Sequence, residues 1–318
     1  MNAQTWSQAW RHAARAFWAV EEPSSHFTTS AGPLVAERIA EIVREVDARL
    51  GHPAEFTVVD IGCGDGGLLA DVRERSGDLA ERARWVGVDV RPFRRAGIES
   101  VISEAPAPLA FAPLRGVVMA HEWLDEIPCD VIERDYDGAN RLVLVDERGV
   151  ETLGPPLDDD DACTAYGVDA AQAHAWLERW WPLREAGDRA EVGTSRDRAW
   201  QWMSGLVDDG AILATDYGHA RVERKSTHRR GTLAAYQRGR LVTPVPDGSA
   251  NLTAHVALDS CADAVPGTVL SGQRDEVAAP LLSEGPSPVE VERHFAALRL
   301  RDPGRLGGVG WLRWDARR

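Results

Sequence analysis

Residues 57–69 read Thr57-Val58-Val59-Asp60-Ile61-Gly62-Cys63-Gly64-Asp65-Gly66-Gly67-Leu68-Leu69, and this stretch decides the fold. A β-prone run ends at Ile61, a glycine-rich turn follows, and residues 68–75 suit a helix. Glycines at 62, 64 and 67 let the backbone approach a ligand closely, and a helix N-terminus offers free amide hydrogens. The spacing Gly-x-Gly-x-x-Gly alone is weak evidence for a dinucleotide site.

Two carboxylates make the prediction more specific. Asp60 stands two residues before the first glycine, where a negative charge suits an amine-bearing or cationic ligand better than a pyrophosphate. Asp89 lies near the end of the next predicted strand, residues 84–90, where it can accept hydrogen bonds from both hydroxyls of a ribose. Together these features resemble the cofactor site of class I methyltransferases, so we predict S-adenosyl-L-methionine as the cofactor.

Composition limits the classes of partner and compartment. The chain has 318 residues and a formal net charge of −14, which disfavours a nucleic-acid backbone as a partner and permits a basic one. Its four cysteines are scattered without a Cys-x-x-Cys pair, so they indicate neither a disulfide framework nor zinc, and we predict no metal site. Because no apolar run reaches membrane-spanning length and the start lacks a signal peptide, we expect a cytoplasmic protein that binds no membrane.

The rest of the chain shows the mixture of helices and strands that an α/β sheet requires. Helices are expected at residues 3–20, 33–49, 68–75, 168–185, 195–207 and 288–299, and strands at 57–61, 84–90, 100–102, 116–120, 210–218 and 307–314. We predict a Rossmann-like, doubly wound, mostly parallel seven-stranded sheet. The expected domains are a helical N-terminal cap at 1–52 and a methyltransferase domain at 53–318, with insertions at about 128–190 and 219–262.

Local patterns add three expectations. Alternating apolar and polar residues at 129–147, around Asp137-Gly138, predict a β-hairpin after the fourth strand. Residues 154–161 contain two prolines and four consecutive aspartates, which is typical of a solvated linker. Ser30 stands just before the helix at 33–49 and is expected to cap it.

A polar cluster follows the fourth strand, where open α/β sheets bind ligands. Glu122 and Asp125, three residues apart in a turn, can share one face and pair with a guanidinium group; capping or pairing with local arginines is the structural alternative. His121 is a candidate general base or a contact to the methionine part of the cofactor, and otherwise a satisfied polar residue at a strand end. Asp216 and Tyr217, at the end of the fifth strand, are further candidates to line the pocket, with core packing as the alternative for Tyr217.

Several separated stretches together resemble the MidA-like methyltransferases, a family that includes the mitochondrial complex I assembly arginine methyltransferase. They follow the family's order from about residue 25 to the C-terminus: Phe27-Thr28-Thr29-Ser30, Asp60 to Gly67, His121 to Pro128, Gly210 to Gly218, Gly231 to Tyr236, Asn251 to Val256, and Gln273. The resemblance implies methylation of a protein arginine. The predicted cofactor-binding residues are Thr29, Asp60, Gly62, Cys63, Gly64, Asp65, Gly66, Asp89, Val90 and His121, and the predicted catalytic residues are His121, Glu122 and Asp125.

The chain also departs from this family. The family loop usually reads Gly-Pro-Gly-Arg-Gly, where this chain has Gly62-Cys63-Gly64-Asp65-Gly66, while His121 replaces an Asn and Asn251 replaces an Asp. These changes leave open a small-molecule N- or O-methyltransferase of secondary metabolism, or a non-catalytic assembly factor that retains the fold. The predicted partner is a methyl-acceptor protein or small molecule, cationic in the arginine interpretation, and a homodimer is left open.

Overall fold

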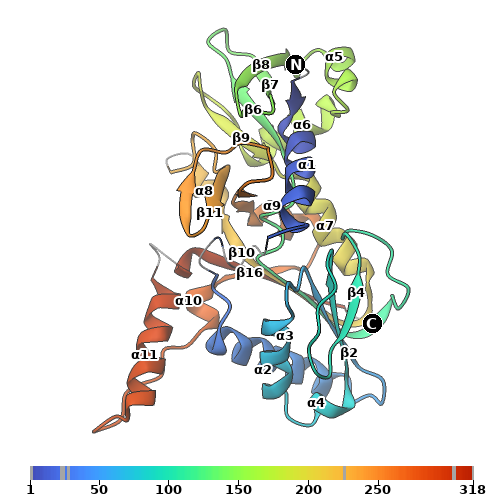
Figure 1. The fold of residues 1–318 in the computed structure, drawn as a ribbon, viewed down its shortest axis with the longest axis vertical. Helices are drawn as coiled ribbons and strands as arrows, with labels where there is room; N and C mark the ends of the chain where they lie inside the picture. The colour runs from blue at the N-terminus through green and yellow to red at the C-terminus, as the bar shows by residue number, and fades with distance from the viewer. Residues whose placement is uncertain (1–2, 22–25, 27–28, 225–226, 303–305, 317–318) are drawn as a thin grey trace. The chain divides into compact units, whose positions relative to one another are not determined.

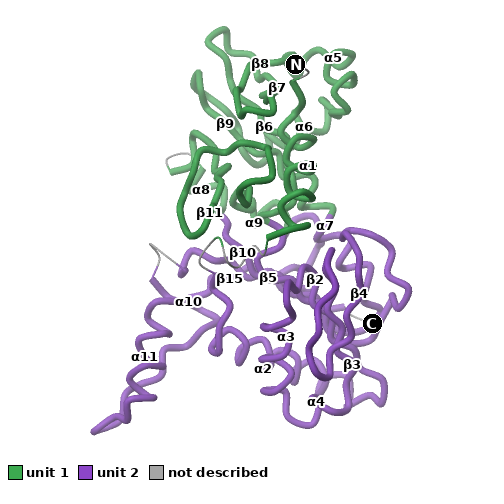
Figure 2. The backbone as a smooth tube through the Cα atoms, viewed as in Figure 1, with its two compact units in different colours: residues 1–28, 125–198, 219–261 green, residues 29–124, 199–218, 262–318 purple. Residues whose placement is uncertain are grey.

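The structure is a computed structural model that describes residues 3–21, 26, 29–224, 227–302 and 306–316. The chain forms two compact units, which are coloured separately in Figure 2. Unit 1 consists of residues 1–28, 125–198 and 219–261, and unit 2 of residues 29–124, 199–218 and 262–318. The two predicted insertions fall largely in unit 1, and the predicted cap at 1–52 is divided between the units.

Unit 2 carries the large sheet and its helices. Its strands are β2 (Thr57–Ile61), β3 (Arg84–Asp89), β4 (Glu99–Ile102), β5 (Leu114–His121), β10 (Val207–His219), β15 (Val269–Gly272) and β16 (Val309–Asp315). Its helices are α2 (Pro33–Arg49), α3 (Gly67–Arg75), α4 (Leu79–Arg82), α10 (Gln273–Glu276) and α11 (Pro288–Arg301), with a 3₁₀ turn at Leu306–Gly308. Helix α7 (Thr194–Gly205) and strand β10 each include residues of both units.

Seven of the eight strands of this sheet lie in the order β4-β3-β2-β5-β10-β16-β15, and the eighth, β14 (Val256–Ala257), pairs with β10. Pairs from β4 to β10 are parallel, whereas β16 is antiparallel to both of its neighbours. Numbered along the chain, this order is 3-2-1-4-5-7-6, so it reverses between β2 and β5. The predicted Rossmann-like, mostly parallel sheet is confirmed, and the reversal is where such sheets bind ligands.

The central strands are buried on both faces. Val58 and Met119 belong to a hydrophobic cluster that also contains apolar residues of α2, α3 and α11, while the alternate residues Val59 and Ile61 are buried as well. A strand covered on both faces normally reads as a continuous apolar run. Asp60 interrupts that run in the most buried part of the sheet, so it needs an explanation beyond packing.

Unit 1 contains two smaller sheets and their helices. Its strands are β1 (Gln4–Thr5), β6 (Asp130–Arg134), β7 (Asn140–Val145), β8 (Glu151–Pro156), β9 (Arg189–Val192), β11 (Ala234–Gln237), β12 (Arg240–Val242), β13 (Asn251–Thr253) and β14 (Val256–Ala257). Its helices, which are labelled in Figure 1, are α1 (Trp6–Trp18), α5 (Asp160–Ala165), α6 (Ala170–Trp180), α8 (Arg221–Arg224) and α9 (Leu258–Ala264). The last residues of α9 belong to unit 2.

The hairpin and helices of unit 1 largely follow the sequence pattern. Strands β6 and β7 pair antiparallel across the turn at Asp137-Gly138, as predicted. Helix α1 buries Trp6 and Trp10 against β6, β7 and the small sheet β12-β11-β13. The linker predicted at 154–161 is wrong, because Gly154-Pro155-Pro156 continues β8 and Asp160 begins α5. Within the residues that the structure describes, strand β8 pairs only with β7, and a sheet edge tolerates proline because it needs no second row of donors.

The predicted cap of α2 is also wrong. The N-cap is Gly32, without a side-chain hydrogen bond, and Pro33 occupies the first helical turn. The Ser30 side chain is turned instead toward the end of β5, where its hydroxyl donates to Glu122. In the part of the chain that the structure describes, no helix is both long enough and apolar enough to cross a membrane.

The close pairing of β2 and β5 predicts a strong effect at Gly116. This residue has φ of 145°, and an added Cβ would lie 2.0 Å from the backbone oxygen of Thr57 on the neighbouring strand. Backbone cannot move aside cheaply, so we expect Gly116→Ala to lower the free energy of unfolding by about 1–3 kcal/mol or more. Urea denaturation measures this, with Gly205→Ala as the control because nothing lies within 4 Å of its added Cβ. Equal stability of the two variants would contradict the packing described.

Candidate active site

The glycine loop begins where β2 ends, at the reversal of strand order. Gly62, Gly64 and Gly66 have φ of 70°, 57° and 75°, a backbone conformation that other residues rarely adopt. The Gly62 amide donates to the Val88 carbonyl of β3 at 2.9 Å, and the Gly66 amide donates to the Cys63 carbonyl at 2.9 Å. Helix α3 then starts at Gly67, so its N-terminus faces the same edge of the sheet.

The loop glycines differ in what surrounds them. An added Cβ on Gly62 would lie 2.6 Å from Cδ1 of Trp123, and one on Gly66 would lie 2.7 Å from Cε2 of Phe93. Gly64 has nothing within 4 Å at the same position. Gly62 and Gly66 are therefore required by protein packing, whereas Gly64 exposes its backbone to open space that a ligand can occupy.

Two acidic residues hold the loop in place. Asp89 accepts a hydrogen bond from the Gly64 amide at 2.9 Å through Oδ2 and one from the Arg91 amide at 3.2 Å through Oδ1. Burial raises the pKa of Asp89, although these backbone donors act in the opposite direction. Asp65 accepts from the Gly67 amide at 2.8 Å and pairs with Arg95. Each Asp89 oxygen can still accept a further hydrogen bond, while the exposed Asp65 contributes to loop shape.

The remaining loop residues have simpler positions. Cys63 is buried, and an added Cβ on Gly87 of β3 would lie 2.7 Å from its Sγ. Burial, together with the charges of Asp60 and Asp89, raises the pKa of the Cys63 thiol, so it is not a thiolate nucleophile. Val90 is half-buried directly after β3.

Asp60 is the buried acid of β2. Its side chain is 2 % exposed, and among the described residues Oδ1 has no hydrogen-bond partner. Burial raises the pKa of Asp60 to about 7, against a lowering effect of His121 and with a raising effect of Asp89. A buried carboxyl oxygen without a donor is costly, and a bound cation or amine would satisfy it.

The end of β5 carries the second polar group. Glu122 is 8 % exposed and has φ of 52°, which is uncommon for a residue other than glycine. Its Oε1 accepts from the amide and the hydroxyl of Ser30, both at 2.7 Å, and lies 3.5 Å from His121 Nε2. Burial opposes ionisation, but the charge that His121 carries when it is protonated, together with hydrogen bonds from His121, Ser30 and Thr29, lowers the pKa of Glu122. Glu122 is therefore a buried, ionised carboxylate.

Strand β10 fixes the turn that carries Glu122. The Glu122 amide donates to the Thr215 carbonyl at 2.8 Å, and the Leu124 amide donates to Asp216 Oδ2 at 2.7 Å. The Thr215 hydroxyl bonds His121 Nδ1, and Ser30 Oγ lies 3.3 Å from His121 Nε2. Ser30 and Thr215 were missed from the sequence as site residues, although Ser30 stands in a stretch that matched the resembled family. Phe27 and Thr28 of that stretch lie outside the described residues.

Asp125 has its contacts in unit 1. Its Oδ2 accepts from the Thr253 hydroxyl at 2.5 Å, and its carbonyl accepts from the Ala254 amide at 3.1 Å and from Arg196 at 2.9 Å. Arg196 is 1 % exposed and also bonds the carbonyls of Ile127 and His255. Glu126 accepts from Asn251 Nδ2 at 2.8 Å. The stretches 125–128 and 251–256, both singled out from the sequence, therefore fold against each other within unit 1.

Most of the predicted cofactor residues lie at one edge of the unit 2 sheet. Thr29, Asp60, the loop 62–66, Asp89, Val90 and His121 all belong to unit 2, at or near the ends of β2, β3 and β5. The unpartnered Oδ1 of Asp60, the open face of Gly64 and the accepting oxygens of Asp89 fit a ligand with a cationic end and ribose hydroxyls. S-adenosyl-L-methionine is such a ligand.

The comparisons agree with this geometry. Residues 34–269 match the model of a family described as "Putative S-adenosyl-L-methionine-dependent methyltransferase". The chain belongs to this family. The predicted resemblance to the MidA-like methyltransferases is confirmed for the family. The protein is a methyltransferase whose cofactor is S-adenosyl-L-methionine.

Solved structures share the fold at low sequence identity. An uncharacterised protein from Burkholderia thailandensis aligns with a TM-score of 0.75 and 19 % identity, covering 99 % of this chain and 87 % of its own. A second structure from the same organism, of a likely methyltransferase bound to S-adenosylhomocysteine, aligns with a TM-score of 0.71 and 18 % identity, covering 99 % of this chain and 88 % of its own. None of the curated proteins compared with the chain matches it.

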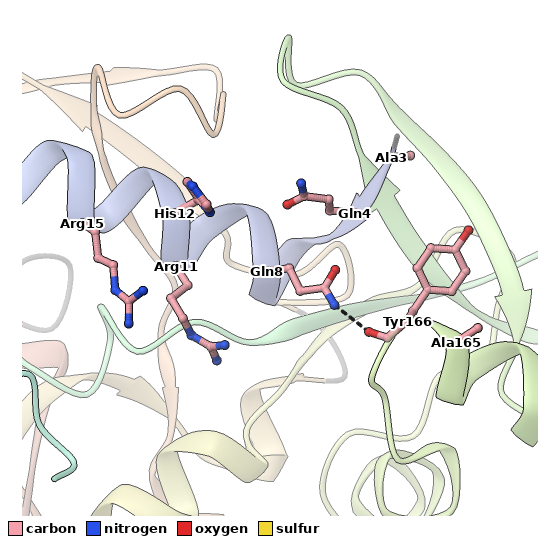
Figure 3. Close-up of a pocket in the computed structure, with 8 residues that line it drawn as sticks. All are labelled: Ala3, Gln4, Gln8, Arg11, His12, Arg15, Ala165 and Tyr166. Atoms are coloured by element: carbon pink, nitrogen blue, oxygen red, sulfur yellow. Dashed lines mark hydrogen bonds between the residues drawn. The ribbon is translucent and has the colours of Figure 1, made fainter. Parts of the chain in front are cut away.

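A separate cavity lies in unit 1 and contains none of these residues. It has a volume of about 800 Å³ and is lined mainly by α1, with Arg11, His12 and Arg15 along one side of the helix (Figure 3). Gln8 bonds the Tyr166 carbonyl across it at 2.7 Å. Its basic side chains are exposed, so we assign it no ligand.

The open space at Gly64 predicts the effect of a side chain there. Gly64→Val should abolish S-adenosyl-L-methionine binding in calorimetry, because the isopropyl group would fill the space left for the ligand. Gly77→Val is the matched control, since Gly77 has φ of 65° and also has nothing within 4 Å of an added Cβ. Both variants carry the same kind of backbone strain, about 1–2 kcal/mol. Normal binding by Gly64→Val would remove the glycine loop from the cofactor site.

The raised pKa of Asp60 predicts a pH-dependent affinity. If the ionised carboxylate accepts the cationic end of the cofactor, the affinity should rise with pH and level off above about 7. Between about pH 5.5 and 7.5 the gain should be on the order of tenfold, following the ionised fraction of Asp60. Calorimetry on the wild type and Asp60→Asn measures it. A wild-type slope that survives in Asp60→Asn would assign the titration to another group.

Proposed function

We propose that this methyltransferase transfers the methyl group to the guanidinium of a protein arginine. The observation that supports the proposal most is Glu122: a buried carboxylate, kept ionised, at the end of β5 and beside the strand-order reversal. A cationic acceptor would be attracted to such a charge, and a guanidinium can pair with a carboxylate through two parallel hydrogen bonds. The net charge of −14 also favours a basic partner, which is consistent with a cationic acceptor.

The residues have distinct tasks in this mechanism. When bound, S-adenosyl-L-methionine would supply the methyl group on its sulfonium: an acceptor nitrogen would attack the methyl carbon in line, S-adenosylhomocysteine would leave, and the acceptor would give up a proton to solvent. Asp89, held by the Gly64 amide, would accept from the ribose hydroxyls, and Asp60 would balance the positive charge of the ligand. Glu122 would orient the acceptor nitrogen and stabilise its positive charge, which is mainly catalysis by positioning and electrostatics. Asp125 remains in the proposal as a second carboxylate because of its spacing from Glu122 in the chain.

Two other functions remain candidates for specific reasons. The changed loop residues Cys63 and Asp65, with His121 and Asn251, favour a branch that methylates a nitrogen or oxygen of a small molecule. The same departures are compatible with an assembly factor that binds the cofactor without turnover.

We also propose that residues 53–318 act as one methyltransferase domain with two insertions. A cytoplasmic location is supported by four buried free cysteines, and a homodimer stays open.

One labelling experiment separates these functions. The protein is incubated with bacterial lysate and S-adenosyl-L-methionine carrying an isotopic methyl group, and proteins and metabolites are analysed by mass spectrometry. Labelled arginine in a protein supports the proposal. Label found only in a small molecule favours the second function, and cofactor binding without any labelled product favours the third.

The acceptor class also predicts the order of two substitutions. Glu122→Gln should keep cofactor affinity but lower kcat by about 10²-fold or more, because the amide retains the shape and loses the charge. With a neutral hydroxyl acceptor, His121→Ala should cause the larger loss, as expected for a missing base. Steady-state kinetics on the identified acceptor measures both, with Glu99→Gln on the exposed strand β4 as the control. Normal turnover in both variants would make the cluster after β5 structural.

A further inference from the structure

Ser30 and Thr215 contact opposite sides of the same imidazole ring. Ser30 Oγ lies 3.3 Å from His121 Nε2, and Thr215 Oγ1 bonds Nδ1. Ser30 and Thr215 are 1 % exposed, so solvent offers few alternative partners. All three residues and Glu122 belong to unit 2. Neither hydroxyl is accounted for by capping or by the sheet's backbone pairing.

The number of available hydrogens fixes the direction of these bonds. A hydroxyl has one hydrogen, and that of Ser30 is donated to Glu122 Oε1 at 2.7 Å, since an ionised carboxylate only accepts. Ser30 Oγ must then accept from His121, so Nε2 carries the hydrogen. In the neutral imidazole the other nitrogen is an acceptor, and Nδ1 takes the hydrogen of Thr215.

We propose that Ser30 and Thr215 are positioning residues of the methyl-transfer site, which hold His121 in the tautomer protonated at Nε2 and so keep Glu122 in place as the charged group. This inference rests on the proposed function. In this arrangement neither ring nitrogen has a lone pair available for the proton of an acceptor. His121 therefore orients Glu122 through Ser30 and is not the general base.

The consequence for the acceptor is chemical. A hydroxyl acceptor needs a base before it attacks, whereas a guanidinium that is oriented by a nearby carboxylate can release its proton to solvent after the methyl group is transferred. Here the carboxylate of Glu122 is available, whereas both ring nitrogens of His121 are hydrogen-bonded to hydroxyls. Such a site suits a guanidinium acceptor. The arrangement thus narrows the methyl acceptor toward a guanidinium group.

The tautomer can be measured without any acceptor. Side-chain ¹⁵N shifts of the full-length protein identify which nitrogen is protonated, at about pH 8.5, two units above the ordinary pKa of histidine. His121→Gln assigns the signals. We expect hydrogen on Nε2 in the wild type. Hydrogen on Nδ1 would overturn the inference, because Ser30 could not then donate to both partners.

The positioning role is tested by removing each hydroxyl. Thr215→Val keeps the shape of the side chain, and Ser30→Ala removes the link to Glu122. Each should lower kcat by about tenfold or more, the scale of one lost hydrogen bond, leave cofactor affinity unchanged and mix the two tautomers. Thr215→Ser and Ser30→Thr keep the hydroxyl, so they should retain the wild-type kcat and tautomer. The control is Thr57→Val, at another strand threonine of unit 2, which should change neither.

The outcomes separate this inference from the proposed function. Variants that keep the wild-type tautomer while losing activity would overturn the positioning role. Protonation at Nε2 in a protein that methylates only a hydroxyl would support the positioning of His121 and overturn the arginine proposal. Thermal unfolding of each variant shows whether it is folded. If Ser30→Ala does not fold, the isosteric Thr215→Val still tests the positioning role.

Discussion

The parallel pairing of β2 with β5 is the constraint on which the site of unit 2 depends. Ile61 pairs with Ala120, so the glycine loop and His121 leave the sheet side by side although they are far apart in sequence. The pairing is tight enough that Gly116 leaves no space for a side chain against Thr57. A shift of the register by one residue would exchange the faces of each strand and separate the two polar groups.

Burial at this edge gives two carboxylates opposite properties. No described residue donates to Asp60 Oδ1 and the pKa of Asp60 is raised, whereas Glu122 has two donors from Ser30 and its pKa is lowered. The number of donors, and the nearby imidazole, decide the sign in the same buried environment. One acid is thus left for a ligand to satisfy, and the other is held charged by the protein. Pairs of groups whose pKa values are driven apart are common in active sites.

The sequence predicted the parts of this arrangement that local pattern controls. The strand bounds of β2, the whole of α2 and the turn of the β6–β7 hairpin follow from periodicity and turn residues. Strand β8 was missed because Gly154-Pro155-Pro156 is unfavourable for a strand except at an edge, and edge positions depend on tertiary pairing. The contact of Ser30 with Glu122 spans 92 residues of chain, so capping was the only local explanation for that serine.

The loop residues that differ from the family pattern, Cys63 and Asp65, make contacts within the protein that stabilise the loop. In the proposed site the loop would meet the cofactor with its backbone, and its open face at Gly64 depends on φ and not on the side chains at 63 and 65. Cys63 fills the small space above Gly87, and Asp65 pairs with Arg95 while accepting from the Gly67 amide at the start of α3. Side chains at these two positions therefore stabilise the loop from the protein side, away from Gly64. We therefore expect substitutions at Cys63 and Asp65 to affect the stability of the loop, whereas a change at Asp60, Gly64 or Asp89 would alter the surface of the proposed cofactor site.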